Sequence, residues 1–509
     1  MPFDDALILG GDDELGSALV AGGVAVSWRR PRSSSDTGSL VVVTEDCSLT
    51  ISDVARHLAP GGTLYMEVDR RRRGQRTRST GRVERMLRKR GHQLFSIHIA
   101  APDFDHPRRY LPIDHRGALR WYLRVLVIAA TPVARAGSSV LSALLSTPVG
   151  EPLLRLSVPR YTMIATRAHD DSSAVGIPMA RGGERAIVVT SGYDKASRAV
   201  VLPFAPGAHA PRFAVKIASS PATAVGTVRE HERLIALHAA LPEDIARGIP
   251  EPMGTFTLAG RTACVQSCAP GPLMNATVGQ WRRPLGETYR DLEAVVDWLS
   301  EFALATAVDR DTARQDWMSI FRDAGGVVDL PAGVIELLAE AECVAAGTRL
   351  GGLAVHQHYD AAPWNVHLDG TKAVLIDWET DDLRPADCLG PPLADVAYLV
   401  SYWYFLVSGA RSDEQEEAAL LRVFATPAAT DPAVVAARSA IDRAARRVGV
   451  ERCAVPAAVV AMWAERMVYT HRRRAALGKP IGAGRSRPEA YLRALAASSS
   501  PLFATWQDG

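Results

Sequence analysis

The chain has 509 residues, of which 47% are hydrophobic and 22% are charged, and its formal net charge is +2. This length exceeds what one hydrophobic core usually organises, so we expect two or more domains. The composition is that of a folded globular protein, which excludes a largely disordered chain or a membrane-embedded one. The small net charge gives no sign of a polyanionic partner for the molecule as a whole.

The cysteines and the apolar segments favour a cytoplasmic protein. Only Cys264 and Cys268 lie close together, without the second pair that a zinc site would need, so we expect reduced, buried thiols. The most apolar long stretch, 121–149, is interrupted by Pro132 and Arg135 and lacks the roughly 20 apolar residues that span a bilayer. The acidic start of the sequence is unlike an export signal. The oligomeric state is not readable from the sequence.

The first third of the chain alternates short apolar runs with helical patterns. Predicted strands begin at Ala6, Val24, Leu40, Thr63 and Leu94, and predicted helices cover 14–21, 51–58 and 81–90. Such alternation is typical of a parallel, doubly wound α/β sheet, so we expect a Rossmann-like domain over residues 1–167 that ends with a strand at 161–166. Residues 168–185 are rich in Gly, Ser and Asp and predict a linker.

Beyond the linker the pattern changes to several strands followed mostly by helices. Strands are predicted at 187–190, 199–202, 213–217 and 263–266, with a helix at 228–239. This order predicts an α+β domain whose antiparallel sheet lies in 186–270 and whose helical part lies in 271–509. Three helical segments have core-like spacing and are expected to supply packing residues rather than ligands: the helix with Val295, Trp298, Leu299 and Phe302, the aromatic stretch 398–405, and 459–474.

The densest cluster of chemistry-bearing residues is HYDAAPWNVHLDGTKAVLIDWE, residues 358–379. Phosphoryl transfer requires a carboxylate at the attacking hydroxyl and oxygen ligands for Mg²⁺. Asp360 and Asn365 have the separation of the base and the metal-binding amide in the kinase catalytic loop H-R-D-x-x-x-x-N. Asp377 follows at the end of an apolar run, and the turn Asp369-Gly370 predicts a hairpin that brings it to Asn365. The alternative is an ordinary β-hairpin with polar turn residues.

This segment resembles the aminoglycoside phosphotransferase and choline kinase family, whose catalytic loop is H-x-D-x-x-x-x-N and whose metal-binding aspartate lies in I-D-W-E or I-D-F-E. The resemblance implies that Asp360 is the catalytic base. It also implies that Asn365 and Asp377 bind Mg²⁺, while His358 braces the loop. The fold it implies is a bilobal, protein-kinase-like one, over residues 180–509.

Two further positions compare with the same family. The segment LGPPLADVAYL is similar to the family's G-x-P-x-x-D-L, which implies that Asp395 supports the catalytic loop. Tyr359 replaces the glycine of the usual H-G-D, a departure that need not abolish activity.

A kinase of this type needs a lysine on a strand and a glutamate on the following helix. Lys216 in Phe-Ala-Val-Lys-Ile supplies the lysine, which would lie on the nucleotide phosphates as a point charge. Glu230 is favoured as its partner, with Glu232 as the alternative. Taken alone, the lysine and the glutamates would be an exposed strand residue and a solvated helix face.

Two loops are expected to contact the nucleotide. The loop 190–198 lacks G-x-G-x-x-G, so its hydroxyls and backbone N–H groups, at Ser191 and Ser197, are the expected phosphate contacts. At the expected passage between the lobes, backbone groups of Gln266, Ser267 and Cys268 are predicted to contact the base.

The first domain resembles class I S-adenosylmethionine methyltransferases, whose L-x-P-G-G turn precedes the fifth strand; here the turn is Leu58-Ala-Pro-Gly-Gly62. Two features depart from that family. The loop 10–16 is less glycine-rich than the usual cofactor loop, and Trp28-Arg29 stand where an acid normally binds the ribose hydroxyls. Arginine has no acceptor to replace that acid, although Asp12 or Glu14 could compensate. We therefore expect a degenerate domain that does not bind S-adenosylmethionine.

One strongly basic segment remains. Its cations are Arg70, Arg71, Arg72, Arg73, Arg76, Arg78, Arg82, Arg85, Arg88, Lys89 and Arg90. Such a cluster can contact an anionic membrane, a nucleic acid or a phosphorylated glycan, or it can be a solvated face. No aromatic residues interleave it, so nucleic acid binding is not expected.

Together these features predict an ATP-dependent and Mg²⁺-dependent small-molecule kinase that phosphorylates a hydroxyl group, with GTP as an alternative donor. Two other functions stay open: a bifunctional protein with an active methyltransferase domain, and a pseudokinase-type binding scaffold. A pseudokinase usually loses the lysine, the base or the metal ligand, and all three are present here. An aminoglycoside, a sugar, an amino alcohol or a glycan intermediate would all suit this catalytic loop, because specificity lies in the helical wall.

Overall fold

The computed structural model describes 5–9, 25–28, 38–44, 54, 57–69, 80–89, 91–101, 108–127, 132–167, 184–190, 198–218, 221–258, 260–278, 283–312, 316–327, 329–378, 383, 388–427, 430–476, 478 and 486–507. The chain divides into two compact units. The first comprises 1–127, 133–231 and 252–268, and the second comprises 128–132, 232–251 and 269–509.

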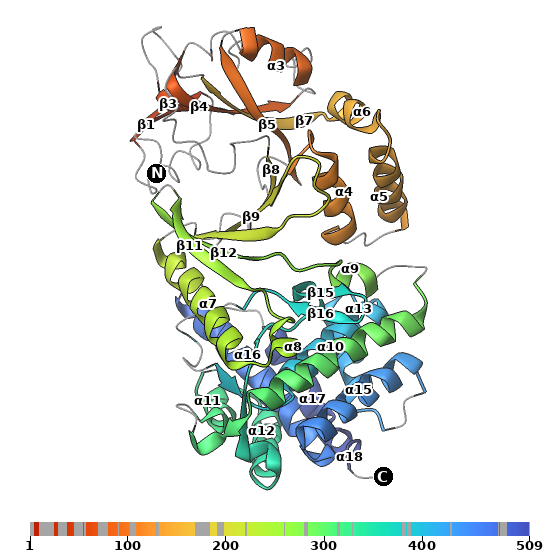
Figure 1. The fold of residues 1–509 in the computed structure, drawn as a ribbon. Helices are drawn as coiled ribbons and strands as arrows, with labels where there is room; N and C mark the ends of the chain where they lie inside the picture. The colour runs from red at the N-terminus through yellow and green to blue at the C-terminus, as the bar shows by residue number, and fades with distance from the viewer. Residues whose placement is uncertain are drawn as a thin grey trace. The chain divides into compact units, whose positions relative to one another are not determined.

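Within the described residues of the first unit, twelve strands form one sheet, in the order β11-β12-β10-β9-β8-β6-β5-β7-β4-β3-β1-β2 (Figure 1). Their bounds are β1 Asp5–Leu9, β2 Ala25–Trp28, β3 Gly38–Val43, β4 Leu58–Asp69, β5 His92–Ala101, β6 Arg109–Pro112, β7 Arg160–Arg167, β8 Arg185–Thr190, β9 Arg198–Phe204, β10 Phe213–Ala218, β11 Pro252–Leu258 and β12 Arg261–Ser267. The helices of this unit are α3 Thr80–Lys89, α4 Arg116–Val125, α5 Pro132–Leu145, α6 Gly150–Ser157 and most of α7, Pro221–Ala240.

One end of this sheet has the parallel order predicted for the first domain. β2, β1, β3 and β4 are parallel neighbours, and β7 runs antiparallel between β4 and β5. Their apolar side chains, such as Val41, Leu64 and Met66, are fully buried in one core. The predicted helix 14–21 lies outside the described residues, as does most of 51–58.

Helix α3 carries the described part of the basic segment. Two of its residues, Val83 and Leu87, are buried, whereas Arg82, Arg85 and Lys89 are exposed. Arg88 pairs with Glu84 of the preceding turn at 2.7 Å. Residues 70–78 and 90 lie outside the described residues.

The sheet continues from strands that precede the predicted linker to strands that follow it. β6 pairs antiparallel with β5 on one side and with β8 on the other. Helix α4 covers this junction, where Trp121 packs edge-on against Phe204 of β9 at a ring distance of 5.8 Å. Such long-range pairing leaves no local pattern in the sequence, because it joins segments more than 70 residues apart.

The other end of the sheet is antiparallel throughout, as the sequence predicted. β8, β9, β10, β12 and β11 are successive neighbours, and α7 follows β10 along the chain. β11 has no counterpart among the predicted strands. It is an edge strand with mostly exposed side chains, it contains Pro252 and Gly254, and so it lacks the alternating apolar pattern that marks a strand.

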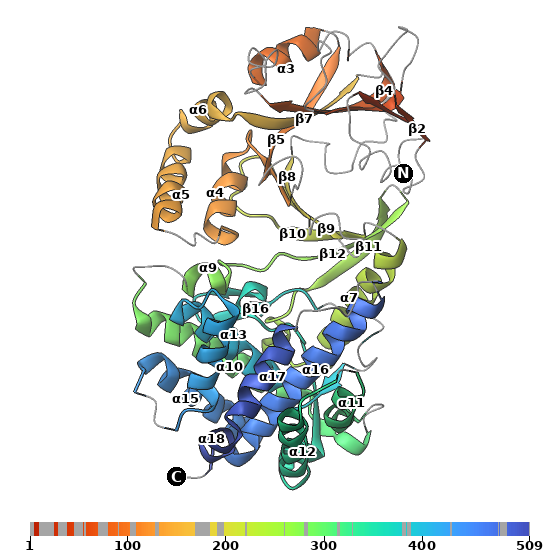
Figure 2. The same cartoon turned by 180° about the vertical axis from the view of Figure 1, so that it is seen from behind.

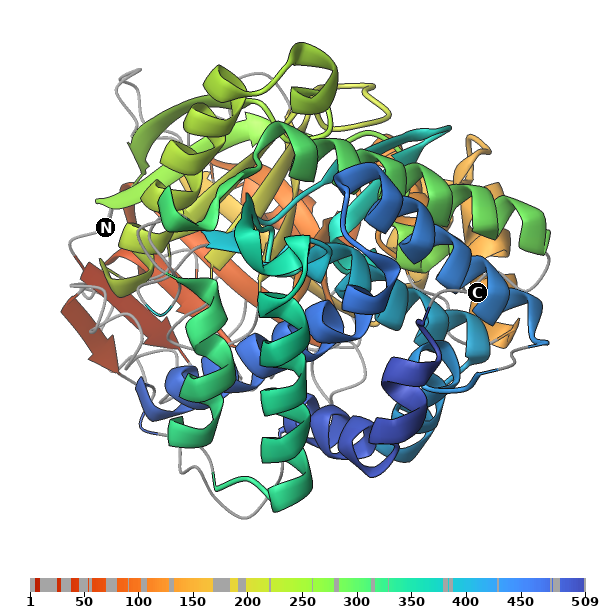
Figure 3. The same cartoon turned by 90° about the horizontal axis from the view of Figure 1, so that it is seen from below.

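The second unit is mostly helical and has one large apolar core. Its helices are the rest of α7, α8 Glu243–Ala246, α9 Met274–Val278, α10 Leu285–Ala305, α11 Ile320–Val327, α12 Ala332–Ala346, α13 Ala394–Ser408, α14 Asp413–Phe424, α15 Pro432–Val448, α16 Val455–Ala476, α17 Arg487–Ala497 and α18 Ser499–Ala504. Figures 2 and 3 show α16 and α17 beside α12. Val295, Leu299 and Phe302 of α10 are buried, as predicted. Among the described helices, none has the length and apolarity to cross a membrane.

Short strands of the second unit carry the predicted catalytic segment. They are β13 Val308–Asp309, β14 Leu353–His356, β15 Val366–Asp369, β16 Lys372–Leu375 and β17 Leu389–Gly390. β14 pairs with β13 and β17, and β15 pairs with β16, so the segment 357–365 links two small sheets.

Replacement of Gly271, which packs against the β15–β16 hairpin, is expected to destabilise the protein. Its φ is +78°, and an added Cβ would lie 1.9 Å from the backbone oxygen of Leu368 at the hairpin. Gly271→Ala should therefore lower the free energy of unfolding by at least about 2 kcal/mol, since left-handed strain adds to a backbone clash. Urea unfolding measures the loss. Gly352→Ala is the matched control, because that position is open and has no positive φ. Equal stability of the two variants would show that neither the positive φ of Gly271 nor its approach to Leu368 requires a glycine.

Candidate active site

The β15–β16 hairpin brings the two predicted metal ligands, Asn365 and Asp377, to the same end of its paired strands. Val366 pairs with Leu375, and just beyond this pair the N–H of Ile376 donates to the oxygen of Asn365 at 2.9 Å. Asp377 follows directly. The turn differs by one residue from the prediction, because Asp369 still pairs with Lys372 and the loop is Gly370-Thr371. Glycine with φ +64° at the first loop position is the preference of a type II′ turn.

Asp395 holds the backbone of the catalytic loop. It lies in the first turn of α13 and is 8% exposed. Its two carboxylate oxygens accept the N–H groups of His358, at 2.6 Å, and Tyr359, at 3.0 Å. Charge-assisted bonds of this kind are about twice as strong as neutral ones, so the loop is fixed where it leaves β14.

His358 connects the loop to the segment that carries Asp377, a predicted metal ligand. Its Nε2 donates to the oxygen of Ile376 at 2.9 Å, and its Nδ1 accepts the N–H of Asp360 at 3.2 Å. Burial lowers the pKa of His358 to about 4, so the ring is neutral at physiological pH. A neutral ring with one donor and one acceptor matches both partners.

Acidification is expected to destabilise the protein through His358. The unfolded chain binds a proton near the ordinary pKa of 6.5, whereas the native state binds it only near 4. The free energy of unfolding should therefore fall as the pH drops from about 6.5 to about 4, by up to about 3 kcal/mol from this group. Urea midpoints at about pH 7.5 and about pH 5 measure the effect.

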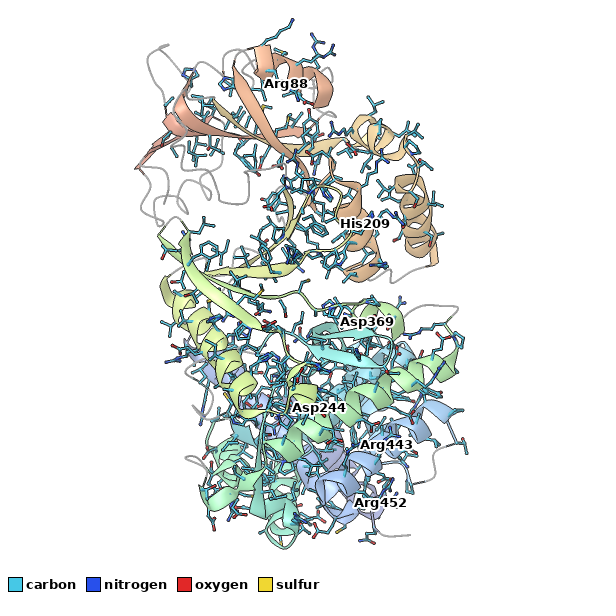
Figure 4. All side chains as sticks on the ribbon, viewed as in Figure 1. Arg88, His209, Asp244, Asp369, Arg443 and Arg452 are labelled. Carbon is cyan, nitrogen blue, oxygen red and sulfur yellow. The ribbon has the colours of Figure 1, made fainter. Side chains whose placement is uncertain are left out.

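His358→Asn should reduce that pH difference, and His209→Asn, at an exposed position that Figure 4 labels, should leave it unchanged. If the His358 variant loses as much stability on acidification as the unaltered protein, the pH dependence arises elsewhere.

Tyr359 occupies a backbone conformation that favours glycine. Its φ is +66°, which costs a non-glycine residue roughly 1–2 kcal/mol. The ring is buried and its hydroxyl donates to the oxygen of Leu389 at 3.2 Å. The buried ring and this bond offset the strain of a tyrosine in this conformation. Asp377 also has a positive φ, of +69°. Such strain is typical of functional sites.

Asp360 is the most heavily bonded polar side chain of the loop. Its Oδ2 accepts Asn365 Nδ2 at 2.8 Å and Trp364 Nε1 at 3.4 Å. Its Oδ1 accepts the Tyr398 hydroxyl at 3.1 Å and Arg466 Nη2 at 2.8 Å. Burial raises the pKa of Tyr398 well above its usual value, so the hydroxyl stays protonated and can donate. The carboxylate is thereby held in one orientation from two sides.

Two of these partners were not foreseen from the sequence. Tyr398 on α13 and Arg466 on α16 belong to segments predicted to supply packing residues rather than ligands. Both also bond to Asp360, a contact that the sequence did not predict. Arg466 also donates to the oxygen of Tyr359 and the hydroxyl of Tyr398, and it covers the Tyr398 ring at 4.1 Å. An arginine among charged residues of a long helix carries no local signal of this role.

Asn365 and Asp377 offer a donor set that suits Mg²⁺. The amide nitrogen of Asn365 donates to Asp360, which leaves its amide oxygen for a cation. A carboxylate and an amide oxygen are the hard ligands that Mg²⁺ takes, usually one or two from the protein with the rest from phosphates and water. Among the described residues, no group of three or more His, Cys, Asp or Glu forms a closed metal cage.

In the first unit, Lys216 and Glu230 form a buried ion pair. Lys216 Nζ lies 2.5 Å from Glu230 Oε1, and Arg198 Nη1 lies 2.9 Å from Glu230 Oε2. Glu230, rather than the exposed Glu232, is therefore the partner of the lysine. Arg198, at the start of β9, was not foreseen.

The predicted nucleotide-contact loops are only partly described. Ser191 and Ser197 lie outside the described residues. Gln266 and Ser267 end β12, where both pair with β10, and the N–H of Cys268 donates to Arg212 at 3.4 Å. Burial raises the pKa of the Cys268 thiol to about 12, so the thiol is protonated at physiological pH.

The sequence and the structure were compared with those of known proteins. Residues 200–433 match the phosphotransferase enzyme family, APH. A search of curated proteins gave no match. Similar solved structures include a provisionally assigned aminoglycoside phosphotransferase from Ralstonia eutropha, with 12% identity, TM-score 0.40, and coverage of 62% of this chain and 93% of that one. The aminoglycoside phosphotransferase APH(3'')-Id from Streptomyces rimosus has 18% identity, TM-score 0.29, and coverage of 61% and 90%.

A third solved structure, WbdD with a kinase inhibitor, has 10% identity, TM-score 0.25, and coverage of 87% of this chain and 84% of that one. At these TM-scores the structural similarities are remote, and the family match carries the comparison. It includes every predicted site residue except Ser191 and Ser197, and it ends before Arg466. Residues 200–433, a little under half of the chain, thus match the model of a phosphotransferase enzyme family.

Proposed function

We propose that this protein is a Mg²⁺-dependent kinase that transfers the γ-phosphoryl group of ATP to a hydroxyl of a small molecule. The main support for this proposal is the arrangement of Asp360, Asn365 and Asp377 on one loop and the hairpin that follows it. These residues lie inside a segment that matches a phosphotransferase family. GTP is the alternative donor. A cytoplasmic location, where ATP is available, belongs to the same proposal.

Asp360 is proposed to act as the general base of the reaction. Asp360 Oδ2 takes the proton of the acceptor hydroxyl while the acceptor oxygen bonds to the γ-phosphorus and the bond to the bridging oxygen breaks, which releases the nucleoside diphosphate. The oxygen that takes the proton is the one held by Asn365, and the other is held by Tyr398 and Arg466. This leaves the carboxylate little freedom to rotate, which is the positioning that phosphoryl transfer depends on.

The remaining groups bind the nucleotide. Lys216, oriented by Glu230, would hold the nucleotide phosphates, and Asn365 and Asp377 would hold Mg²⁺. A cation held there would supply positive charge against the phosphate oxygens. A pseudokinase scaffold is disfavoured, since the lysine, the base and both metal ligands are present.

Replacing Asp377 tests the metal assignment. Asp377→Asn should raise the Mg²⁺ concentration for half-maximal ATP turnover by about tenfold or more, because a neutral amide binds the cation more weakly than a carboxylate. ATP consumption is measured against Mg²⁺ concentration. Asp369→Asn, at the exposed hairpin turn labelled in Figure 4, is the control. An unchanged Mg²⁺ requirement would remove Asp377 from the metal site.

For the first 167 residues we propose a methyltransferase-like domain that has lost cofactor binding. The parallel order β2-β1-β3-β4, next to the antiparallel β7, supports the fold. Because β6 pairs with β8, residues 1–167 do not end at a sheet boundary, so binding is best measured on the full chain. Calorimetry that finds micromolar S-adenosylmethionine binding would instead support the bifunctional alternative.

A further inference from the structure

We propose that the helix pair α5–α6 of the first unit is a docking face for an anionic lipid surface, which holds the protein at a membrane without spanning it. Membrane docking goes beyond the proposed kinase function and does not depend on it. Two features of these helices support it: apolar side chains that face solvent, and a row of arginines beside them.

Helices α5 and α6 expose apolar side chains where a surface helix normally carries charge. The three most exposed large hydrophobic residues of the described chain lie here: Val133 at 82%, Val140 at 68% and Leu156 at 62%. Val133 and Val140 are two turns apart and so share one face of α5. Val149, at the corner between the helices, and Leu153 are exposed as well. Single exposed hydrophobic residues are common, but five on one helix pair indicate a contact surface.

The solvent side of α5 has no charged residue among the side chains that the structure describes. Its exposed residues are Val133, Ala136, Gly137, Ser139, Val140 and Ala143. A second side of the helix is apolar too, because Leu141 and Leu145 pack against the core that contains Trp121 of α4 (Figure 1). A helix that is apolar on more than one side is usually buried on each of them. The protein itself covers one apolar side of α5 and leaves the other for a partner.

The corner between the two helices is fixed in place. Arg116 of α4 donates to the oxygen of Pro148 at 2.9 Å and lies 3.5 Å from Glu151 of α6. Gly150, the first residue of α6, packs so tightly on α5 that an added Cβ would lie 2.1 Å from the oxygen of Leu144. The exposed apolar residues therefore belong to a fixed helix pair and not to a loose loop.

The charges around this face select an anionic partner. From the start of α4 to the end of α6 the chain has five arginines and one acid: Arg116, Arg120, Arg124, Arg135 and Arg155, against Glu151. Glu151 is already paired, with Arg116 at 3.5 Å and Arg155 at 3.1 Å. Arg120 and Arg124 are exposed and follow Arg116 at helical spacing, so the three form a row along α4. Cations beside an apolar helix face are typical of a helix that lies in the interface of an anionic bilayer.

Other occupants fit this face less well. A two-fold contact with a second copy of the chain would bring the same arginines of both copies together, and like charges across an interface oppose association. A specific protein partner usually binds aromatic or arginine anchors in a well-packed centre, whereas the exposed large apolar residues of α5 and α6 are valine and leucine. Lipid chains require only apolar bulk, which these side chains supply.

Vesicle binding of the full-length protein tests the proposal. Sedimentation with sucrose-loaded vesicles measures the lipid concentration at which half of the protein is bound. For phosphatidylcholine with about 30 mol% phosphatidylglycerol, this concentration should be about tenfold or more below that for phosphatidylcholine alone, because each arginine near an anionic surface adds affinity. Salt at about 1 M should remove most of the difference, since it screens the arginines.

Substitutions separate the apolar and the basic contributions. Val140→Asp and Leu156→Asp should each raise the half-binding lipid concentration on the mixed vesicles by about tenfold or more, because a charge replaces an apolar side chain that inserts. Ile335→Asp is the matched control: this residue is 52% exposed on α12, a helix with glutamates on its exposed side, and its replacement should change nothing. Arg120→Gln/Arg124→Gln should shrink the preference for phosphatidylglycerol to within about threefold.

Melting temperatures check that each variant is folded, and ATP consumption without vesicles should equal that of the unaltered protein. The proposal is overturned if the protein binds neither kind of vesicle, or if Val140→Asp and Leu156→Asp both bind as the unaltered protein does. In the latter case, loss of binding in Arg82→Glu/Arg85→Glu would assign the contact to α3 instead. A dimer that Val140→Asp dissociates would also overturn the proposal, because the face would then belong to a second copy.

Discussion

Asp360→Asn is expected to lower kcat by about 10²–10⁴-fold, the usual contribution of a general base, while the affinity for ATP changes by no more than about twofold. The amide keeps the shape of the side chain and can still accept from Tyr398, but it cannot take the acceptor's proton. Single-turnover ATP consumption in the presence of an acceptor measures the chemical step, and nucleotide titration followed by melting temperature measures binding.

Two control variants distinguish loss of the catalytic carboxylate from a disturbed loop structure. Asp369→Asn on the same hairpin should keep full activity, and Asp360→Glu should recover part of the rate if a carboxylate at this place is what matters. Because Arg466 loses its carboxylate partner in Asp360→Asn, the melting temperature of each variant has to be compared as well. If Asp360→Asn turns over at the unaltered rate, the assignment of the base is wrong.

The local part of the site could be predicted from the sequence because its signals are local. Asp360, Asn365 and Asp377 lie within one segment, where residue spacing and a glycine turn determine which groups meet. Even there the hairpin register was displaced by one residue. Two neighbouring turn residues with similar preferences leave the exact pairing open, and cross-strand packing decides it.

The distant part of the site could not be predicted in this way. Arg466 reaches Asp360 from 106 residues away, and it does so because α16 packs beside α13 in the second unit. Periodicity places an arginine on a helix face, but which element covers that face is a tertiary property. The pairing of β6 with β8 could not be predicted from the sequence for the same reason. Helical periodicity identified the core of α10, since burial of an apolar stripe needs no knowledge of the partner.

Glu230→Gln is expected to cost more stability than Lys216→Met, although both remove the same ion pair. The Glu230 side chain is 2% exposed and holds two cations, Lys216 at 2.5 Å and Arg198 at 2.9 Å. Loss of its charge leaves two buried cations without a carboxylate, a situation that typically costs about 3–5 kcal/mol. Lys216→Met leaves the Glu230–Arg198 pair intact and replaces the lysine by an apolar chain of similar length. Its cost should be about 1–2 kcal/mol.

For activity we expect the opposite order: Lys216→Met should lose more activity than Glu230→Gln when each variant is assayed below its own melting transition. Lys216 is the group proposed to touch the nucleotide, so its loss should lower kcat/KM for ATP by about 10²–10³-fold, as for other preorganised donors at a transition state. Glu230→Gln keeps the lysine and should lose less, because Glu230 only orients it. Urea midpoints and ATP kinetics on the same preparations give both orders, with Glu232→Gln, exposed on the same helix, as control.

The double variant Arg198→Met/Lys216→Met removes both cations that contact Glu230. It leaves Glu230 as a buried carboxylate with neither cation, so its loss of stability should exceed the sum of the two single losses by more than about 1 kcal/mol. Simple additivity would show that Arg198 does not compensate Glu230 when the lysine is absent. A larger activity loss in Glu230→Gln than in Lys216→Met would mean that the glutamate, and not the lysine, acts on the nucleotide. The first unit would then need a different assignment of its nucleotide site.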